Sequence, residues 1–442
     1  MKKIINAIKN PKKNNIVGAI KAYHSWRKLS LPYELKLLMT SLVLVAIIGV
    51  IFGWTTQREE KKISNQQILD STAEKRTNLP NNLEPSKLSS LPLPTTKNQN
   101  PLKPLTPSAD STQPKIISSS LPKVSNSKQK KQITSTTELA YKHIPSKFSN
   151  SQKLQEIVNA VIQEAKEKNL PTQQLSITLI DVNTGTIAGY QQQNLRYPAS
   201  VVKLFWMVAL YNQIYAGLLQ QDQGLFGDLE KMIKESNNDA GSRIINTITK
   251  TTSGSNLPQQ EYQAWLKKRT LVNRFFRSAN YEGIDISHKT FPVRSEGMSS
   301  PQGRDLQMRG NIKKQTRNKI STEQAARLMY EITNGRSISQ EYSQHMAFLL
   351  VRDLRPEAWE NIDPNTGRFN PIKGFLGESL PTNVVFLSKA GWTSKTRQEV
   401  AYVNDLQTAY ILAVFGEDKA YSQNLEIFPK ISSIVYQKMH SP

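Results

Sequence analysis

The stretch Tyr197-Pro-Ala-Ser200-Val-Val-Lys203-Leu-Phe-Trp-Met-Val-Ala-Leu210 decides how the chain is interpreted. It places a serine three residues before a lysine, ahead of an apolar run, so both side chains share one face if a helix begins here. A serine hydroxyl becomes a nucleophile when a neighbouring base takes its proton, and a lysine is such a base when burial or nearby cations lower its pKa. The pattern indicates either this pair or a plain helix cap at Ser200 with a solvated Lys203.

Helical and extended patterns alternate on both sides of this stretch. Apolar residues recur at helical spacing over 151–168, 226–249, 321–334 and 421–438, and the helix of Ser200 continues to about Tyr215. Strands are predicted over 175–182, 186–190, 383–387, 399–403 and 408–415. This order predicts an α+β fold, in which a five-stranded antiparallel sheet is flanked by the terminal helices and carries an inserted helical region.

Composition divides the chain into four parts. Residues 1–36 hold nine Lys and Arg against one acid, 37–54 hold no charge, and 55–144 are rich in Pro, Ser and Lys, with nine prolines between Pro80 and Pro122. Such a linker buries too little apolar surface to offset its ordering entropy. We expect a basic cytoplasmic segment, a transmembrane helix, a disordered linker and a folded domain over 145–442.

The uncharged segment 37–54 has the length of a membrane anchor. As a helix it would extend about 27 Å, close to the roughly 30 Å of a hydrocarbon core. The basic flank before it predicts a cytoplasmic N-terminus and an extracytoplasmic domain, periplasmic at a bacterial inner membrane. A cleaved signal peptide is the rival interpretation, but the preceding region is long and no Ala-x-Ala-like site follows. A buried core helix is the third, and nothing nearby in the sequence would pack on it.

The composition also limits cofactors and partners. The chain has no cysteine and five scattered histidines, so thiolate metal sites are excluded and no cofactor is expected. The net charge of +23 has several readings. The predicted topology argues against nucleic acid, residues 1–36 suit anionic lipid headgroups, and the external charge is either solvated surface or a contact with an anionic wall polymer.

Two further motifs follow in the chain. Ser236-Asn-Asn238 lies between apolar residues of a helical region, and Lys389-Ala-Gly391 lies on the third predicted strand, just after Val384–Leu387. Together with Ser200-x-x-Lys203 they resemble the S-x-x-K, S-D-N and K-T-G motifs of the class A β-lactamase-like and penicillin-binding serine hydrolases, over about 150–440. Taken singly, the second motif could be a polar turn, and Lys389 could guard an exposed sheet edge.

The resemblance implies a role for each residue. Ser200 would attack a lactam or peptide carbonyl, Lys203 would accept its proton, and Ser236 would pass a proton to the leaving nitrogen. Asn238 would hold Lys203 and a substrate amide, and Lys389 would lower the pKa of Lys203 and attract an anionic substrate.

The resemblance also implies an oxyanion hole. Its donors would be the backbone amides of Ser200 and Trp392, with Gly391 allowing close backbone approach. As an alternative, Trp392 only packs at the sheet edge.

The chain departs from the family pattern at several places. Asn237 stands where the second motif has an acid, and Ala390 stands where the third has a hydroxyl, which Thr393 or Ser394 could replace. Residues 267–319 form a basic insertion with thirteen Lys and Arg against four acids, read as a surface loop that could bind an anionic glycan.

No Glu-x-x-x-Asn supplies the deacylating base of class A enzymes, and Glu282 and Glu296 are weak substitutes. We therefore expect a membrane-tethered serine hydrolase that is acylated by β-lactams or peptidoglycan-derived substrates and deacylates slowly. The alternatives are a D-Ala-D-Ala carboxypeptidase, penicillin-binding protein or esterase, and an inactive wall-binding or sensing module.

Overall fold

The computed structural model describes residues 140–441 except 221, 311–314, 363–368 and 406. The predicted cytoplasmic segment, the anchor over 37–54 and almost all of the linker lie outside these residues. No helix in the described ranges is long and apolar enough to cross a bilayer.

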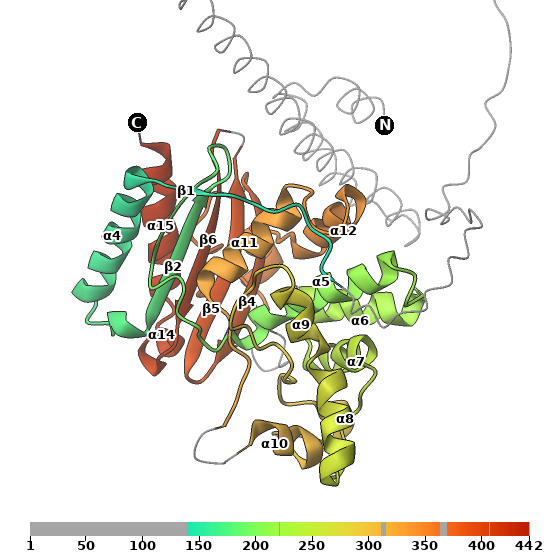
Figure 1. The fold of residues 1–442 in the computed structure, drawn as a ribbon. Helices are drawn as coiled ribbons and strands as arrows, with labels where there is room; N and C mark the ends of the chain where they lie inside the picture. The colour runs from blue at the N-terminus through green and yellow to red at the C-terminus, as the bar shows by residue number, and fades with distance from the viewer. Residues whose placement is uncertain (1–139, 221, 311–314, 363–368, 406, 442) are drawn as a thin grey trace, which may run out of the picture. The chain divides into compact units, whose positions relative to one another are not determined.

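One six-stranded sheet forms the centre of the described domain (Figure 1). Its spatial order is β1-β3-β2-β6-β5-β4, which leaves β4 at one edge. The strands are β1 Ser149–Asn150, β2 Leu175–Asp181, β3 Thr186–Tyr190, β4 Val385–Thr393, β5 Thr396–Asn404 and β6 Ala409–Gly416.

The prediction of five antiparallel strands is wrong in two respects. The sheet has a sixth strand, and that strand pairs parallel and not antiparallel. The five predicted strands exist and pair antiparallel, but β1 adds a sixth and pairs parallel with β3, Ser149 opposite Thr186. Two residues are too few to show the alternation that reveals a strand in a sequence.

Helices cover both faces of the sheet. On one face α4 and α15 pack side by side, and on the other α11 lies against the strands with α5 and α12 beside it. The helices are α4 Gln152–Glu167, α5 Val202–Tyr215, α6 Gln223–Lys234, α7 Asn238–Thr249, α8 Gln259–Arg269, α9 Leu271–Arg277, α10 Gly303–Arg309, α11 Thr322–Thr333, α12 Gln340–Leu350, α13 Pro356–Trp359, α14 Lys419–Gln423 and α15 Ile427–His440.

Helix α5 is the central helix of the second layer. Every residue from Val202 to Gln213 is buried, including Lys203. A helix that is apolar on all sides must be surrounded by other elements, and α6, α7, α9 and α12 contact it. The apolar run after Ser200 therefore fixes the first turn of α5, which carries the predicted lysine, inside the domain.

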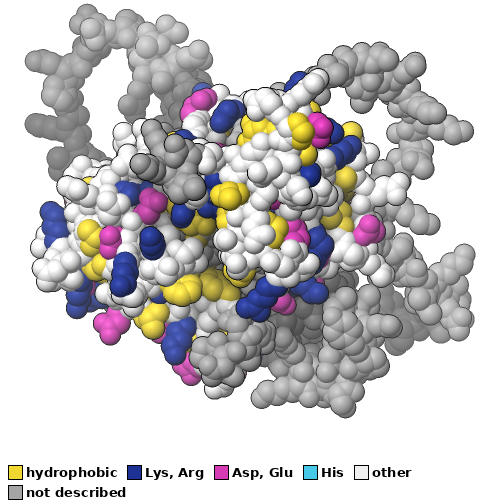
Figure 2. Space-filling model, turned by 90° about the horizontal axis from the view of Figure 1, so that it is seen from below, with side chains coloured by type: hydrophobic (Ala, Val, Ile, Leu, Met, Phe, Trp, Pro, Cys, Tyr) yellow, Lys and Arg dark blue, Asp and Glu magenta, His cyan; other side chains and the backbone are white. Residues whose placement is uncertain are grey.

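The basic insertion is only partly the surface loop that its composition predicted. It contains α9 and α10, and its residues Val272, Phe276, Tyr281 and Ile284 are fully buried in the core that contains α5. Their irregular spacing hid this from the sequence. Figure 2 views the domain from below Figure 1, and basic side chains are interspersed with acidic ones there, as in a solvated surface.

Candidate active site

The serine and lysine of the first motif meet at the start of α5. Ser200 lies in a single 3₁₀ turn, Ala199–Val201, and Nζ of Lys203 donates to its Oγ at 3.2 Å. The same ammonium or amine donates to the carbonyl oxygen of Ser236 at 2.5 Å and to Oδ1 of Asn238 at 2.7 Å. The helix-cap alternative is wrong, because Val201 is the N-cap of α5 and Ser200 makes no capping bond.

Burial sets the chemistry of Lys203. Its side chain is fully inaccessible to solvent, and this desolvation lowers its pKa to about 7. Among the residues that the structure describes, no carboxylate contacts it to restore the charge, and its three partners are neutral oxygens. Gly241 lets it fit, since a Cβ there would lie 3.2 Å from Cε of Lys203. A buried lysine that is substantially neutral near pH 7 can accept a proton from a hydroxyl.

The second motif is a strained turn between α6 and α7. Ser236 has φ 57°, in the left-handed region that a serine rarely adopts. This turn directs its carbonyl to Lys203 while its Oγ accepts from Lys389. Asn237 caps α7 by accepting from the amide of Ala240 at 2.9 Å. An amide oxygen caps a helix as a carboxylate does, so this departure from the family pattern preserves the local structure.

Lys389 reaches the site from the edge strand β4. Its Nζ donates to Oγ of Ser236 at 2.9 Å and to the carbonyl of Ala390 at 2.7 Å, and only 1% of the residue is exposed. It is therefore no edge guard. Burial, followed by the charges of Lys203 and Arg352, lowers its pKa well below the usual range. Burial is the largest cause of the lowered pKa of both lysines, and the expected repulsion between them acts in the same direction.

Gly391 brings β4 against the turn that carries the nucleophile. A Cβ on Gly391 would lie 2.7 Å from the amide nitrogen of Ser200 and 2.8 Å from the carbonyl oxygen of Pro198. The next residue on the strand is Trp392, whose indole is half exposed and donates to the carbonyl of Ser422 at 3.0 Å. This close approach supports an oxyanion hole built from the Ser200 and Trp392 amides.

The variant Gly391→Ala tests this approach. Its methyl group must push β4 away from Ser200, so we expect acylation at Ser200 to fall roughly 100- to 1000-fold, the usual cost of losing one oxyanion donor. The rate of labelling by a fluorescent penicillin measures the effect. Gly227→Ala is the matched control, because a Cβ there meets nothing within 4 Å. Equal rates for both variants would contradict the proposed role of Gly391.

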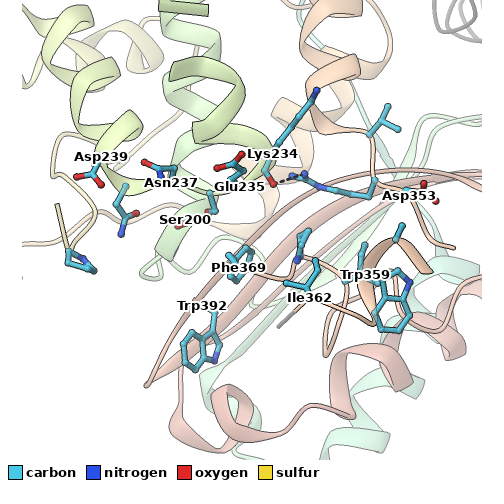
Figure 3. Close-up of a pocket in the computed structure, with 18 of the residues that line it drawn as sticks. Ser200, Lys234, Glu235, Asn237, Asp239, Asp353, Trp359, Ile362, Phe369 and Trp392 are labelled. Atoms are coloured by element: carbon cyan, nitrogen blue, oxygen red, sulfur yellow. Dashed lines mark hydrogen bonds between the residues drawn. The ribbon is translucent and has the colours of Figure 1, made fainter. Parts of the chain in front are cut away.

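A cleft of about 610 Å³ opens at Ser200 (Figure 3). Asn237 and Asp239 line it from one side, and Trp359, Ile362, Phe369 and Trp392 give it an apolar side, with Ser200 between the two groups. The hydroxyl substitutes proposed from the sequence do not reach it, since neither Thr393 nor Ser394 lines the cleft and Oγ1 of Thr393 accepts from the amide of Lys395. Neither residue therefore replaces the missing hydroxyl of the third motif.

Arg352 is a site residue that sequence reasoning missed. It lines the cleft, and its guanidinium donates to the carbonyl oxygens of Ile233, Lys234 and Ser388. It therefore ties the end of α6 to β4 beside Lys389. Three acceptors from segments far apart in the chain leave no pattern in the sequence, so no motif could have indicated this residue.

The candidate deacylating glutamates lie elsewhere. Glu296 accepts from Lys289 at 2.7 Å and from the hydroxyl of Ser242, and although burial raises its pKa, these contacts hold the pKa below its usual value. Glu282 is exposed. Neither glutamate lines the cleft.

Three other carboxylates do line the cleft. Asp239 accepts from the amide and hydroxyl of Ser295. Asp353 forms an ion pair with Arg355. Among the described carboxylates that line the cleft, Glu235 is the one without such a contact.

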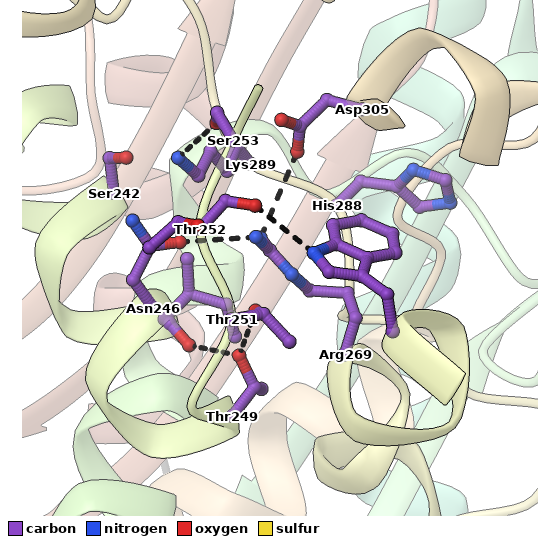
Figure 4. Close-up of polar contacts among 12 residues, drawn as sticks. Ser242, Asn246, Thr249, Thr251, Thr252, Ser253, Arg269, His288, Lys289 and Asp305 are labelled. Atoms are coloured by element: carbon purple, nitrogen blue, oxygen red, sulfur yellow. Dashed lines mark hydrogen bonds and ion pairs between the residues drawn. The ribbon is translucent and has the colours of Figure 1, made fainter. Parts of the chain in front are cut away.

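A buried polar network fastens the insertion to α7, and Figure 4 shows its part around Arg269 and Lys289. Glu296 joins this network through its contacts with Ser242 and Lys289. Lys289 also donates to Ser253 at 2.6 Å. Arg269 donates to Asn246 at 3.1 Å and lies 3.9 Å from Asp305. The network is structural, because it holds the segment around 288–296 against the helix that carries Asn238. In the described part of the chain, no group of three or more His, Asp or Glu side chains could hold a metal ion.

Comparison with known proteins agrees with this geometry. Solved structures similar to this chain include a β-lactamase from Sphaerobacter thermophilus (16% identical, TM-score 0.45, covering 64% of this chain and 95% of that one), a protein described as PBP-A (15%, 0.44, 67% and 98%), and a β-lactamase from Xanthomonas campestris (14%, 0.44, 64% and 98%). No curated protein sequence matches the chain. The profile of the Beta-lactamase enzyme family matches residues 153–439, which include all three motifs, and the chain therefore belongs to that family.

Proposed function

We propose that this protein forms an acyl-enzyme on Ser200 with β-lactams and related D-alanyl peptides, and that it releases the acyl group slowly. The observation that carries the proposal is the buried Lys203 amine, which bonds to the Ser200 hydroxyl and to the second motif and has no carboxylate beside it in the described part of the chain. This environment favours a neutral amine near pH 7, as a general base requires.

Acylation then proceeds by a balanced set of proton transfers. Lys203 takes the proton of Ser200 as Oγ attacks the carbonyl carbon, and the negative charge on the carbonyl oxygen is met by the amides of Ser200 and Trp392. The carbon–nitrogen bond breaks as the leaving nitrogen takes the hydroxyl proton of Ser236. Ser236 then recovers a proton from the Lys203 ammonium, which returns Lys203 to the neutral amine. The Lys389 amine or ammonium, at 2.9 Å from Oγ of Ser236, supports that hydroxyl as it loses its proton.

Slow deacylation follows from the carboxylates. Water attacks an ester quickly only when a base removes its proton. Glu296 is engaged by Lys289 and does not line the cleft, and Glu235 is exposed to solvent. This pattern favours a penicillin-binding protein or D-Ala-D-Ala carboxypeptidase over a fast β-lactamase.

The lifetime of the penicillin adduct tests the proposal. Wild-type protein incubated with benzylpenicillin should gain the mass of one penicillin, located on the peptide that contains Ser200. After the free penicillin is removed, the adduct should persist for minutes or longer. Mass spectrometry over time measures it, and a chromogenic cephalosporin measures turnover. Rapid turnover without an adduct would instead identify a β-lactamase, and neither signal would indicate a wall-binding or sensing module.

We also propose that residues 37–54 anchor this domain at the outer face of a bacterial plasma membrane, with 55–144 as the tether. The proposal rests on the uncharged segment and the basic residues before it. It places the domain where peptidoglycan-derived substrates occur.

A further inference from the structure

Two arginines of the insertion, Arg309 and Arg317, lie beside the loop that leads to the nucleophile. The guanidinium of Arg317 lies over the ring of Tyr197, at 5.8 Å from its centroid, and Tyr197 precedes Ser200 by three residues. The guanidinium of Arg309 lies 5.8 Å from the ring centroid of Phe291. Phe291 is followed by Pro292, which lines the cleft. Each cation therefore lies near an aromatic side chain from a segment that leads to the cleft.

The two charges act on one another and on the same tyrosine. Burial and then the charge of Arg317 lower the pKa of Arg309. Both arginines also act to lower the pKa of Tyr197, against the larger opposite effect of burial. Like charges at such proximity destabilise each other unless an anion lies near both.

Neither arginine forms an ion pair with a carboxylate in the part of the chain that the structure describes. Each arginine has one acid near it, and that acid also faces another arginine. The charge of Asp305 acts to raise the pKa of Arg309. Burial raises the pKa of Glu417, and the charge of Arg317 acts in the opposite direction. Asp305, one turn before Arg309, lies 3.9 Å from Arg269. Glu417 accepts from the amide of Tyr197 at 3.2 Å and lies 3.8 Å from Arg196.

We propose that Arg309 and Arg317 form an anion subsite at the rim of the catalytic cleft, which binds a second carboxylate of the substrate, away from the acylated carbonyl. A planar guanidinium binds a carboxylate through two hydrogen bonds, and a carboxylate between the pair would offset their repulsion. Arg294, also in the insertion, lines the cleft itself and adds a third cation. The insertion thus selects dianionic substrates.

The inference rests on the proposed acylation of Ser200, and it is tested with a matched pair of penicillins. Carbenicillin is benzylpenicillin with one additional carboxylate on its side chain. The wild type should be acylated faster by carbenicillin, and the ratio of the two second-order rate constants should fall about tenfold in Arg309→Gln/Arg317→Gln, as for the loss of a charge-assisted contact. The variant Lys267→Gln/Lys268→Gln removes the same charge from exposed positions of α8 and should keep the ratio.

A binding measurement separates this inference from the proposed function. Calorimetry of both penicillins with Ser200→Ala needs no acylation, and the same preference should be lost on adding the two arginine substitutions. If the wild type is not acylated, but Ser200→Ala prefers carbenicillin and loses this preference with the two arginine substitutions, the proposed function fails and the subsite stands. If acylation occurs and the ratio is unchanged by the arginine substitutions, the subsite is wrong. If neither penicillin binds or acylates, both are wrong.

Discussion

Ser200→Ala is expected to abolish covalent labelling by penicillin while the domain stays folded. The substitution removes one oxygen atom, and the structure records one side-chain hydrogen bond to that atom, from Lys203 at 3.2 Å. Lys203 keeps its bonds to Ser236 and Asn238, so we expect a stability change of about 1 kcal/mol. Intact-mass spectrometry after incubation with excess benzylpenicillin measures the labelling, and the thermal midpoint reports the fold.

Ser236→Ala is the informative comparison. It removes the hydroxyl that accepts from Lys389 but leaves the carbonyl that accepts from Lys203. We therefore expect this variant to label more slowly than wild type and still to reach the full mass increase. Labelling of Ser200→Ala at the wild-type mass would mean that another nucleophile reacts, and the assignment of the first motif would be wrong.

Local patterns predicted the elements that carry the site. The three-residue spacing of Ser200 and Lys203 is confirmed as a contact, since two positions on one helix turn need no long-range information. The five strands with alternating or apolar patterns are confirmed within a few residues, although β4 continues to Thr393 and so carries Lys389 and Trp392. The apolar pattern of this strand stops at Leu387, where polar residues and glycine begin, and the prediction that Lys389 and Gly391 lie on the same strand is confirmed.

What the sequence could not predict depends on distant partners. Arg352 is held by carbonyl groups from α6 and β4, and Lys289 is buried by its contacts with Ser253 and Glu296. Each is a basic residue that composition alone assigns to the surface. Glu296 stays out of the cleft for a related reason. The residue that engages it is Lys289, which lies outside the short helical turn of Glu296 and is brought to it by the fold of the insertion.

The acylation rate is expected to rise with pH through about 7, and Lys203→Met is expected to slow acylation by about 1000-fold. Burial lowers the pKa of Lys203 from 10.5 to about 7, so the neutral amine that accepts the proton is lost as the pH falls below that value. Methionine matches the length of lysine but accepts no proton from Ser200. Rates of labelling by a fluorescent penicillin between about pH 5 and about pH 9 measure both effects. Lys395→Met, on the exposed turn between β4 and β5, is the matched control and should keep the wild-type rate and profile.

A second buried group could produce the same pH dependence and must be separated from Lys203. Burial raises the pKa of Glu399 to about 7, and this residue lies opposite Ala390 on β5, so it faces away from Lys389 across the sheet. Glu399→Gln removes that titration while leaving Lys203 in place. The rise in rate should persist in Glu399→Gln, because the base is the lysine that contacts Ser200. A profile that becomes flat in Glu399→Gln, or that is already flat in the wild type, would show that Lys203 is not the base, since a buried lysine with a lowered pKa must release its proton within this range.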